Sequence, residues 1–179
     1  MEDGGRAPRN REAHCLLAGL EAGIVAALIL LGWLALASAW YRRSIWTTAN
    51  IMATTFYGEA ALTQRFSSRT LAGLALYLVL YGIIGALFGL AVPTRAPGLR
   101  MTLTGVLVGL GWYYLSYALV WRNLNPLIIL YTHGGPMLAG HALYGGLLGR
   151  FPRYLATLAP AGPAPGGPAP GGPAPGDAA

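Results

Sequence analysis

Four apolar segments separated by more polar stretches dominate the hydrophobic pattern of the chain. A helix needs about 20 apolar residues to cross roughly 30 Å of hydrocarbon. The segments Leu16–Trp40, Leu71–Val92, Met101–Trp121 and Pro126–Gly149 each reach that length. The pattern therefore predicts an all-α fold, a polytopic membrane helical bundle with four transmembrane helices that together form one domain over residues 15–158.

Two polar segments and a Pro/Gly-rich repeat flank or interrupt this domain. Residues 1–14 form a polar N-terminal tail, and residues 159–179 repeat the unit PAPGG, which offers no large apolar side chain for a core. We expect this C-terminal tail to be disordered. The connector 41–70 mixes apolar residues with Thr, Asn and Glu59, so it is too polar to span. We expect a helix there that lies in the membrane interface or is tucked back against the bundle.

The first apolar segment has features of both a signal peptide and a retained helix. Ala37-Ser38-Ala39 has the small-residue form of a cleavage site. However, the apolar stretch is longer than the roughly 7–15 residues of a signal-peptide core. Arg42 and Arg43 then follow directly, as in a stop-transfer flank. We therefore expect a retained helix.

The sequence Gly134-Gly135-Pro136 interrupts the fourth apolar segment. Unwound backbone at membrane depth is tolerated only where it is buried in protein or lines a wet cavity, so the break is a candidate kink or re-entrant site. It is equally a candidate boundary between a short interfacial segment, 124–133, and a fourth helix that begins at Pro136 and continues toward Leu155. The sequence leaves these alternatives open.

The composition excludes most classes of soluble protein. Of the 179 residues, 55% are hydrophobic and only 10% are charged, against about 25% charged in a typical soluble domain. All 12 basic residues are Arg, and the 6 acidic residues leave a net charge of +6. Because the arginines lie in short groups at the ends of apolar runs and not in a basic stripe, we expect the lipid bilayer as a partner and no nucleic acid.

The distribution of arginine also predicts an orientation, because cytoplasmic loops carry the excess of basic residues. Four crossings would place seven arginines on the side of the two termini and five on the other. The first group is Arg6, Arg9, Arg11, Arg95, Arg100, Arg150 and Arg153, and the second is Arg42, Arg43, Arg65, Arg69 and Arg122. The prediction is a multi-pass protein of a cell membrane with both termini in the cytoplasm.

Recurring motifs suggest a tandem duplication of a two-helix unit. Gly32-Trp33 and Gly111-Trp112 lie 79 residues apart in the first and third segments. Leu80-Tyr81-Gly82 and Leu143-Tyr144-Gly145 lie 63 residues apart in the second and fourth. With two helices in each unit, both units would insert with the same polarity, which makes a parallel repeat. The alternative is chance recurrence of Gly, Trp and Leu in apolar sequence.

Each apolar segment also contains two glycines four positions apart. Lipid tails are as apolar as leucine, so helices in a membrane associate through close backbone packing, which glycine permits. The predicted helix-packing residues are Gly19, Gly23, Gly85, Gly89, Gly105, Gly109, Gly145 and Gly149. One such pair in each helix predicts a compact bundle or a tight oligomer.

Few ionisable groups lie at membrane depth, and such groups are functional candidates by default. The candidate polar membrane-depth site consists of His141, Tyr144, Glu21 and His133, of which His141 and Tyr144 share a helix face. Burial of His141, His133 and Glu21 together would favour a proton-linked or anion pathway. The alternative is that each makes a structural hydrogen bond or reaches the interface.

Motifs for chemistry are missing from the sequence. The two histidines of the fourth segment are eight residues apart without a carboxylate at zinc-ligand spacing, and a single cysteine, Cys15, excludes a cysteine-based metal cluster. No serine-hydrolase elbow, phosphate-binding loop, dinucleotide fingerprint or HExxH motif occurs. We expect no metal, no cofactor and no catalytic residue.

The fourth segment contains the sequence GHALYGGLLGR, in which His141, Tyr144, Gly145 and Gly149 form the pattern His-x-x-Tyr-Gly-x-x-x-Gly. This pattern resembles small four-helix bacterial inner-membrane proteins of unknown function, the YagU-like group. The resemblance implies a four-span layout and no particular activity.

Taken together, these features predict a non-enzymatic structural or accessory subunit of a membrane complex, either as a homo-oligomer or with a different membrane partner. The alternative is a small oligomeric transporter or channel with a site near the fourth helix.

Overall fold

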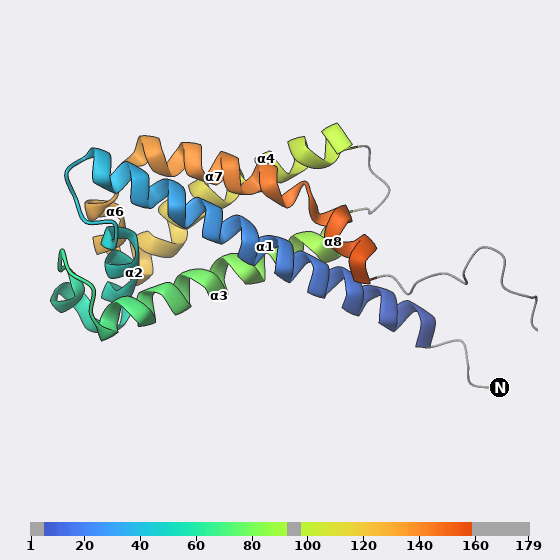
Figure 1. Ribbon diagram of the computed structural model, residues 1–179, viewed down its shortest axis with the longest axis horizontal. Coiled ribbons are helices and arrows are strands. Elements are labelled where there is room, and N and C mark those ends of the chain that lie inside the picture. The colour runs from blue at the N-terminus through green and yellow to red at the C-terminus, as the bar shows by residue number, and fades with distance from the viewer. Residues whose placement is uncertain (1–5, 93–97, 159–179) are drawn as a thin grey trace, which may run out of the picture.

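The structure is a computed structural model that describes residues 6–92 and 98–158, with side chains from Arg11 onward. Within these ranges the regular elements are all helical (Figure 1). The long helices are α1 (Arg6–Trp40), α3 (Ser68–Ala91), α4 (Gly98–Leu115) and α7 (Gly134–Leu148), and α4 continues through the π-helical turn η2 (Ser116–Trp121) into α5 (Arg122–Leu124). The short helices are α2 (Thr47–Tyr57), the 3-10 turn η1 (Gly58–Ala61), α6 (Pro126–Tyr131) and α8 (Phe151–Leu158).

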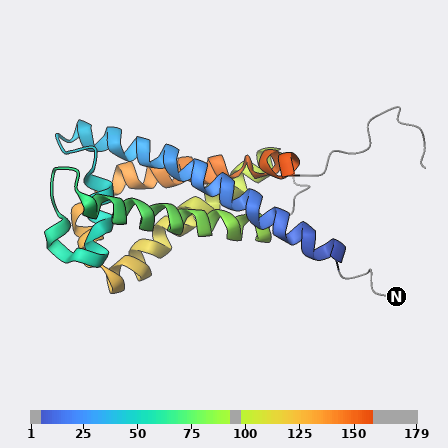
Figure 2. The ribbon, with the colours of Figure 1, turned by 60° about the horizontal axis from the view of Figure 1, so that its bottom comes forward.

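The long helices lie along the long axis of the molecule, and the short ones cover its ends (Figure 1). α1 and α4 run in one direction, and α3 and α7 run in the other. α1 packs against α3 and α7, and α4 packs against α7, as the turned view also shows (Figure 2). α2 and α6 lie at one end of the bundle, and α8 lies at the opposite end beside α1.

Three helical stretches are long and apolar enough to cross a membrane, which gives the chain the helices of an integral membrane protein. They are Arg11–Trp40, Ser68–Ala91 and Gly98–Leu124. The expected fourth span is not among them, because α7 has only 15 residues. At 1.5 Å per residue it is about 22 Å long, shorter than the hydrocarbon layer.

The fourth apolar segment is two helices in the structure, and not the single span over 126–149. The backbone is extended at Thr132 and His133, and α7 begins at Gly134. Pro136 lies in the first turn of α7, where its missing N–H costs nothing because no partner exists there. The Gly-Gly-Pro sequence is therefore the start of a helix. α7 ends at Leu148, so Arg150 lies in the turn before α8 and is exposed.

α2, the helix expected in the connector, is tucked against the bundle. Its residues from Thr47 to Thr54 are all buried. Gly73 of α3 allows this approach, since a Cβ at Gly73 would lie 2.8 Å from the amide nitrogen of Ala53. Asn50 then fixes the chain that follows: its Nδ2 donates to the Thr63 carbonyl at 2.7 Å.

The eight glycines predicted to pack helices lie at two backbone-to-backbone contacts. Gly19 and Gly23 of α1 face Gly85 and Gly89 of α3, and a Cβ at Gly23 would lie 2.8 Å from the Gly85 Cα. The second contact joins α4 to α7 through Gly105, Gly109, Gly145 and Gly149 in the same way. Any side chain at these positions would push the helices apart.

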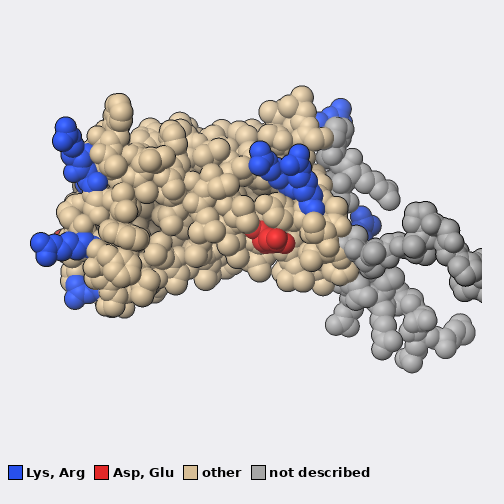
Figure 3. Space-filling model, viewed as in Figure 1, with Lys and Arg blue, Asp and Glu red and all other residues tan. Residues whose placement is uncertain are grey.

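Charged side chains lie toward the two ends of the molecule. Figure 3 shows basic residues gathered toward the ends of one face, with a broad uncharged zone between them. The segments around α2, α5 and η1 carry Arg42, Arg43, Arg65, Arg69 and Arg122, and the segments at the opposite end carry Arg11, Arg100, Arg150 and Arg153. An apolar middle between two charged ends is typical of a protein that lies across a bilayer.

Candidate functional site

The side chain of His141 lies in the middle of the bundle, where α7 meets α3 and α4. It is 2% exposed. Its Nδ1 lies 2.7 Å from the Met137 carbonyl oxygen, which can only accept, so Nδ1 carries the proton. In the neutral ring Nε2 is then an acceptor, and the Tyr81 hydroxyl donates to it at 2.9 Å. Both ring nitrogens are thus occupied.

Tyr144 lies one helical turn further along α7 and is fully buried. Its hydroxyl donates to the backbone carbonyl of Tyr81 at 2.7 Å, and the two rings pack edge to face with centroids 5.0 Å apart. Tyr77 extends the cluster to α1, because its hydroxyl donates to the Ala27 carbonyl at 3.3 Å. Tyr113 of α4 packs on the His141 ring at 5.4 Å. The histidine–tyrosine cluster (Tyr77, Tyr81, Tyr113, His141 and Tyr144) therefore joins all four long helices.

The chemistry available to this cluster is limited by its own hydrogen bonds. Among the described residues, no buried side-chain nitrogen or oxygen lacks a partner. The same part of the chain holds no group of three His, Cys, Asp or Glu close enough to share a metal ion. A buried polar network that is fully bonded makes a structure rigid and specific.

Glu21 does not join the cluster. It is exposed on the outer face of α1. The cause is the helical period, because Gly19, Ala22, Gly23 and Ala26 turn toward the bundle and leave Glu21 on the other side. The convergence of Glu21 with the histidines, on which a proton-linked or anion pathway would depend, is therefore absent from this structure.

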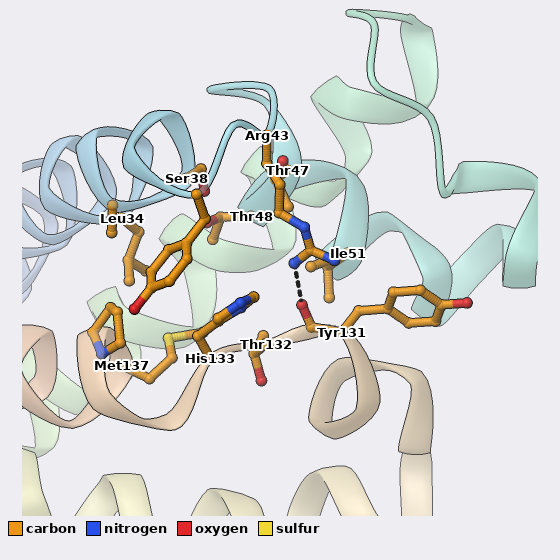
Figure 4. A pocket seen from close by; sticks show the side chains of 13 residues that line it. Leu34, Ser38, Arg43, Thr47, Thr48, Ile51, Tyr131, Thr132, His133 and Met137 are labelled. Atoms are coloured by element: carbon orange, nitrogen blue, oxygen red, sulfur yellow. Dashed lines mark hydrogen bonds between the residues drawn. The ribbon is translucent and has the colours of Figure 1, made fainter.

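His133 also lies apart from His141, at the end of the bundle where α7 begins. Its exposed ring packs on the Tyr41 ring with centroids 4.3 Å apart. Beside it is a cavity of about 40 Å³ between the end of α1 and the starts of α2 and α7 (Figure 4). Arg43 reaches into this cavity, and its guanidinium donates to the Tyr131 carbonyl at 2.8 Å. The four candidate residues thus occupy three separate places.

The sequence alone did not identify Tyr81 and Arg43, which contact the candidate residues in the structure or line the same cavity. Tyr81 is the central member of the histidine–tyrosine cluster, and its signal in the sequence was the Leu-Tyr-Gly motif shared with Tyr144. Arg43 has the sequence position of a membrane flank, and no pattern along the chain shows that its side chain turns inward.

Comparisons with known proteins add no relative. A scan against protein-family models, a search of curated proteins and a search of solved structures each found no match. The resemblance of His141, Tyr144, Gly145 and Gly149 to the YagU-like group stays a prediction.

Proposed function

We propose that this chain is a non-enzymatic structural or accessory subunit of a membrane complex, and not a conduit. The observation that carries the proposal is the fully bonded histidine–tyrosine cluster. A proton or ion path needs polar groups that can exchange partners with water or substrate. In this bundle, Nδ1 of His141 is held by the Met137 carbonyl of its own helix, and the other bonds, from the Tyr81 hydroxyl to Nε2 and from the Tyr144 hydroxyl to the Tyr81 carbonyl, join α3 to α7.

The proposed layout has four crossings, with α7 as the fourth. α7 runs back toward the start of α1, and α8 continues the chain at that end. A 15-residue helix is short for this task, and a locally thinner bilayer would accommodate it. Four crossings would put seven of the 12 arginines of the sequence on the side where α1 begins, and the proposed orientation places that side in the cytoplasm.

A tandem duplication belongs to the same proposal. It is supported by the shared direction of α1 and α4, and of α3 and α7, as a parallel repeat requires. It is also supported by the contact between Tyr81 and Tyr144, which occupy the same place in the two Leu-Tyr-Gly motifs. The glycine contacts are less regular, because the motif alignment pairs Gly145 with Gly82, and the close backbone contact uses Gly85 instead.

The face of α4 supports a role beside a partner. In the most apolar 18 residues of the stretch Gly98–Leu124, which begins with α4, only 17% of residues are buried, against 44% in the most apolar 18 residues of Arg11–Trp40. Leu103, Leu107 and Leu119 point away from the bundle. We infer that a partner helix, from a second copy or from another subunit, covers this face.

Site-specific photo-crosslinking in native membranes tests the proposal. A photoreactive residue at Leu107 on α4 should yield one discrete adduct, and the partner should co-purify at a fixed ratio. The matched control is Leu36, which is equally exposed on α1 and should give only diffuse lipid labelling. Repeated recovery of the chain alone, with no adduct at Leu107, would show that the proposal is wrong.

A further inference from the structure

We propose that Arg43 and the cavity around it bind a phosphate group at the level of the lipid headgroups. This inference does not depend on the proposed subunit function, because the cavity is lined by α1, α2, α7 and the segments beside them, and not by the exposed face of α4. Arg43 lies three residues after the end of α1, is half-buried, and turns its guanidinium into the protein (Figure 4).

The guanidinium of Arg43 has unused hydrogen-bonding capacity. It carries five N–H donors, and within the described residues it makes one hydrogen bond, to the Tyr131 carbonyl. Two hollows flank it, the cavity of about 40 Å³ that His133 also lines and a neighbouring one of about 100 Å³. Arg43, Thr47, Ile51 and Tyr131 line both. A planar, weakly hydrated guanidinium beside free volume is suited to bidentate binding of a phosphate.

Further donors surround the smaller cavity. Thr48 is only 6% exposed and lines it, and its hydroxyl makes no hydrogen bond in the part of the chain that the structure describes. Ser38 also lines the cavity, and its hydroxyl likewise makes no hydrogen bond among the described residues. His133 enters from the opposite wall to Arg43 (Figure 4). Because the part of the chain that the structure describes has no buried side-chain oxygen without a partner, these two hydroxyls open to the cavity, where a phosphate oxygen can accept from them.

The starts of two helices and the surrounding positive charge also favour an anion in this cavity. Thr48 lies in the first turn of α2, and His133 is the residue before α7, so the starts of two helices border one cavity. Neither helix has a side-chain cap, and the N–H groups of a first turn favour an anion. Residues 41–70 and 116–136 contain five arginines and one acidic residue, Glu59. The residues that line the two hollows include no Asp or Glu.

The size of the site limits the ligand. At roughly 10–15 Å³ for each water, a cavity of about 40 Å³ holds about three waters, which suits the oxygens of one phosphate group. Tyr41 and His133 are exposed at its edge, so the rest of a ligand can extend outward. The phosphate could come from an anionic lipid headgroup or from inorganic phosphate, because the recognition chemistry is the same for both.

Binding to the full chain in two settings distinguishes these sources. In the first, inorganic phosphate is titrated into the chain in phosphatidylcholine nanodiscs and followed by calorimetry. In the second, nanodiscs that also contain phosphatidic acid are analysed by native mass spectrometry for retained anionic lipid. Arg43→Gln should weaken binding by about tenfold or more, since charge-assisted bidentate contacts are the strong ones. The control is Arg42→Gln, which removes the same charge from an exposed neighbour outside both hollows and should leave affinity within about twofold.

A second variant keeps the test decisive if Arg43→Gln does not fold. Thr48→Val preserves volume and charge and should weaken binding by about fivefold, the equivalent of one hydrogen bond. Binding in the lipid setting alone identifies a headgroup, and binding of inorganic phosphate alone identifies a soluble ligand; each supports the site. The inference is overturned if the wild-type chain binds in neither setting, if Arg42→Gln and Arg43→Gln weaken binding equally, or if neither Arg43→Gln nor Thr48→Val changes it.

Discussion

Tyr144 donates its hydroxyl proton to the backbone carbonyl of Tyr81 over 2.7 Å, and this bond joins the two Leu-Tyr-Gly motifs of the chain at the centre of the bundle. Tyr81 in turn donates to His141, one helical turn before Tyr144. The two tyrosines therefore tie α3 to α7, which are 63 residues apart at this point. The stability of the bundle should depend on this link.

Replacing Tyr144 with Phe should lower the free energy of unfolding by about 0.5–1.5 kcal/mol, the net value of one hydrogen bond, and toward the low end in a membrane. The control is Tyr114→Phe on α4, because Tyr114 is 62% exposed and its hydroxyl makes no hydrogen bond among the described residues. Unfolding titrations in mixed micelles measure both variants. Equal stability of the two would show that the buried hydroxyl contributes nothing.

The hydrogen bonds of His141 predict its tautomer. Because Nδ1 faces the Met137 carbonyl, the proton should reside on Nδ1, and Nε2 should be unprotonated. ¹⁵N NMR of the histidine-labelled chain distinguishes the two nitrogens by their chemical shifts. The chain has 3 histidines, and a His141→Gln sample assigns the signal. A proton on Nε2 would contradict the arrangement with Tyr81.

Alanine substitution at two glycines of α1, Gly23 and Gly32, should change the stability of the chain differently. A Cβ at Gly23 would lie 2.9 Å from the Tyr81 carbonyl oxygen, whereas a Cβ at Gly32 would meet nothing within 4 Å. Gly23→Ala should therefore destabilise the chain by about 1–3 kcal/mol through overpacking. Gly32→Ala should be neutral or stabilising by up to about 1 kcal/mol, because alanine is the better helix former. Both are measured in the same unfolding titration, and a neutral Gly23→Ala would argue against the α1–α3 contact.

The side chain of Asn50 should hold the segment between α2 and α3 in place. It donates to the Thr63 carbonyl at 2.7 Å and to the Arg65 carbonyl at 3.1 Å, and it accepts from the Thr70 hydroxyl at 2.6 Å. Asn50→Ala removes these bonds and leaves buried groups unsatisfied, at a cost of about 1–3 kcal/mol. Faster tryptic cleavage at Arg65 reports the loosened segment.

The matched control for Asn50 is Asn123, which is exposed and makes one local bond to the Leu119 carbonyl at 2.6 Å. Asn123→Ala should not change cleavage at Arg65. If both substitutions accelerate it equally, Asn50 is not the residue that holds the segment.

The sequence predicted the parts of the fold that local physics determines. Apolar length predicted helices in every segment, and the spacing of glycines such as Gly23 and Gly85 predicted which faces could meet. It did not reveal that the helix start at Gly134 leaves α7 with only 15 residues. The Gly134-Gly135-Pro136 sequence marks the break, but apolar composition continues across it, so the sequence alone does not decide between a kink and the start of a new helix.

The candidate site was harder to predict, because it depends on how each helix is rotated. Glu21 is at an apolar depth in the sequence, yet the glycine contact of α1 turns it outward. Tyr81 looks like one more aromatic residue of a span until His141 is placed opposite to it. Arg43 and Arg42 are neighbours with the same chemistry, and only Arg43 lines the cavity. The position of each of these side chains depends on contacts with residues that are distant in the chain.

We propose that the buried polar groups of this bundle are structural and open no path across the membrane. The most direct test of this claim is proton and anion flux into proteoliposomes that contain the purified full chain, followed with internal pH- and anion-sensitive dyes. We expect flux equal to that of protein-free liposomes, and no change on His141→Ala. Flux above that background that His141→Ala abolishes would contradict the claim and establish a conduit through the histidine–tyrosine cluster.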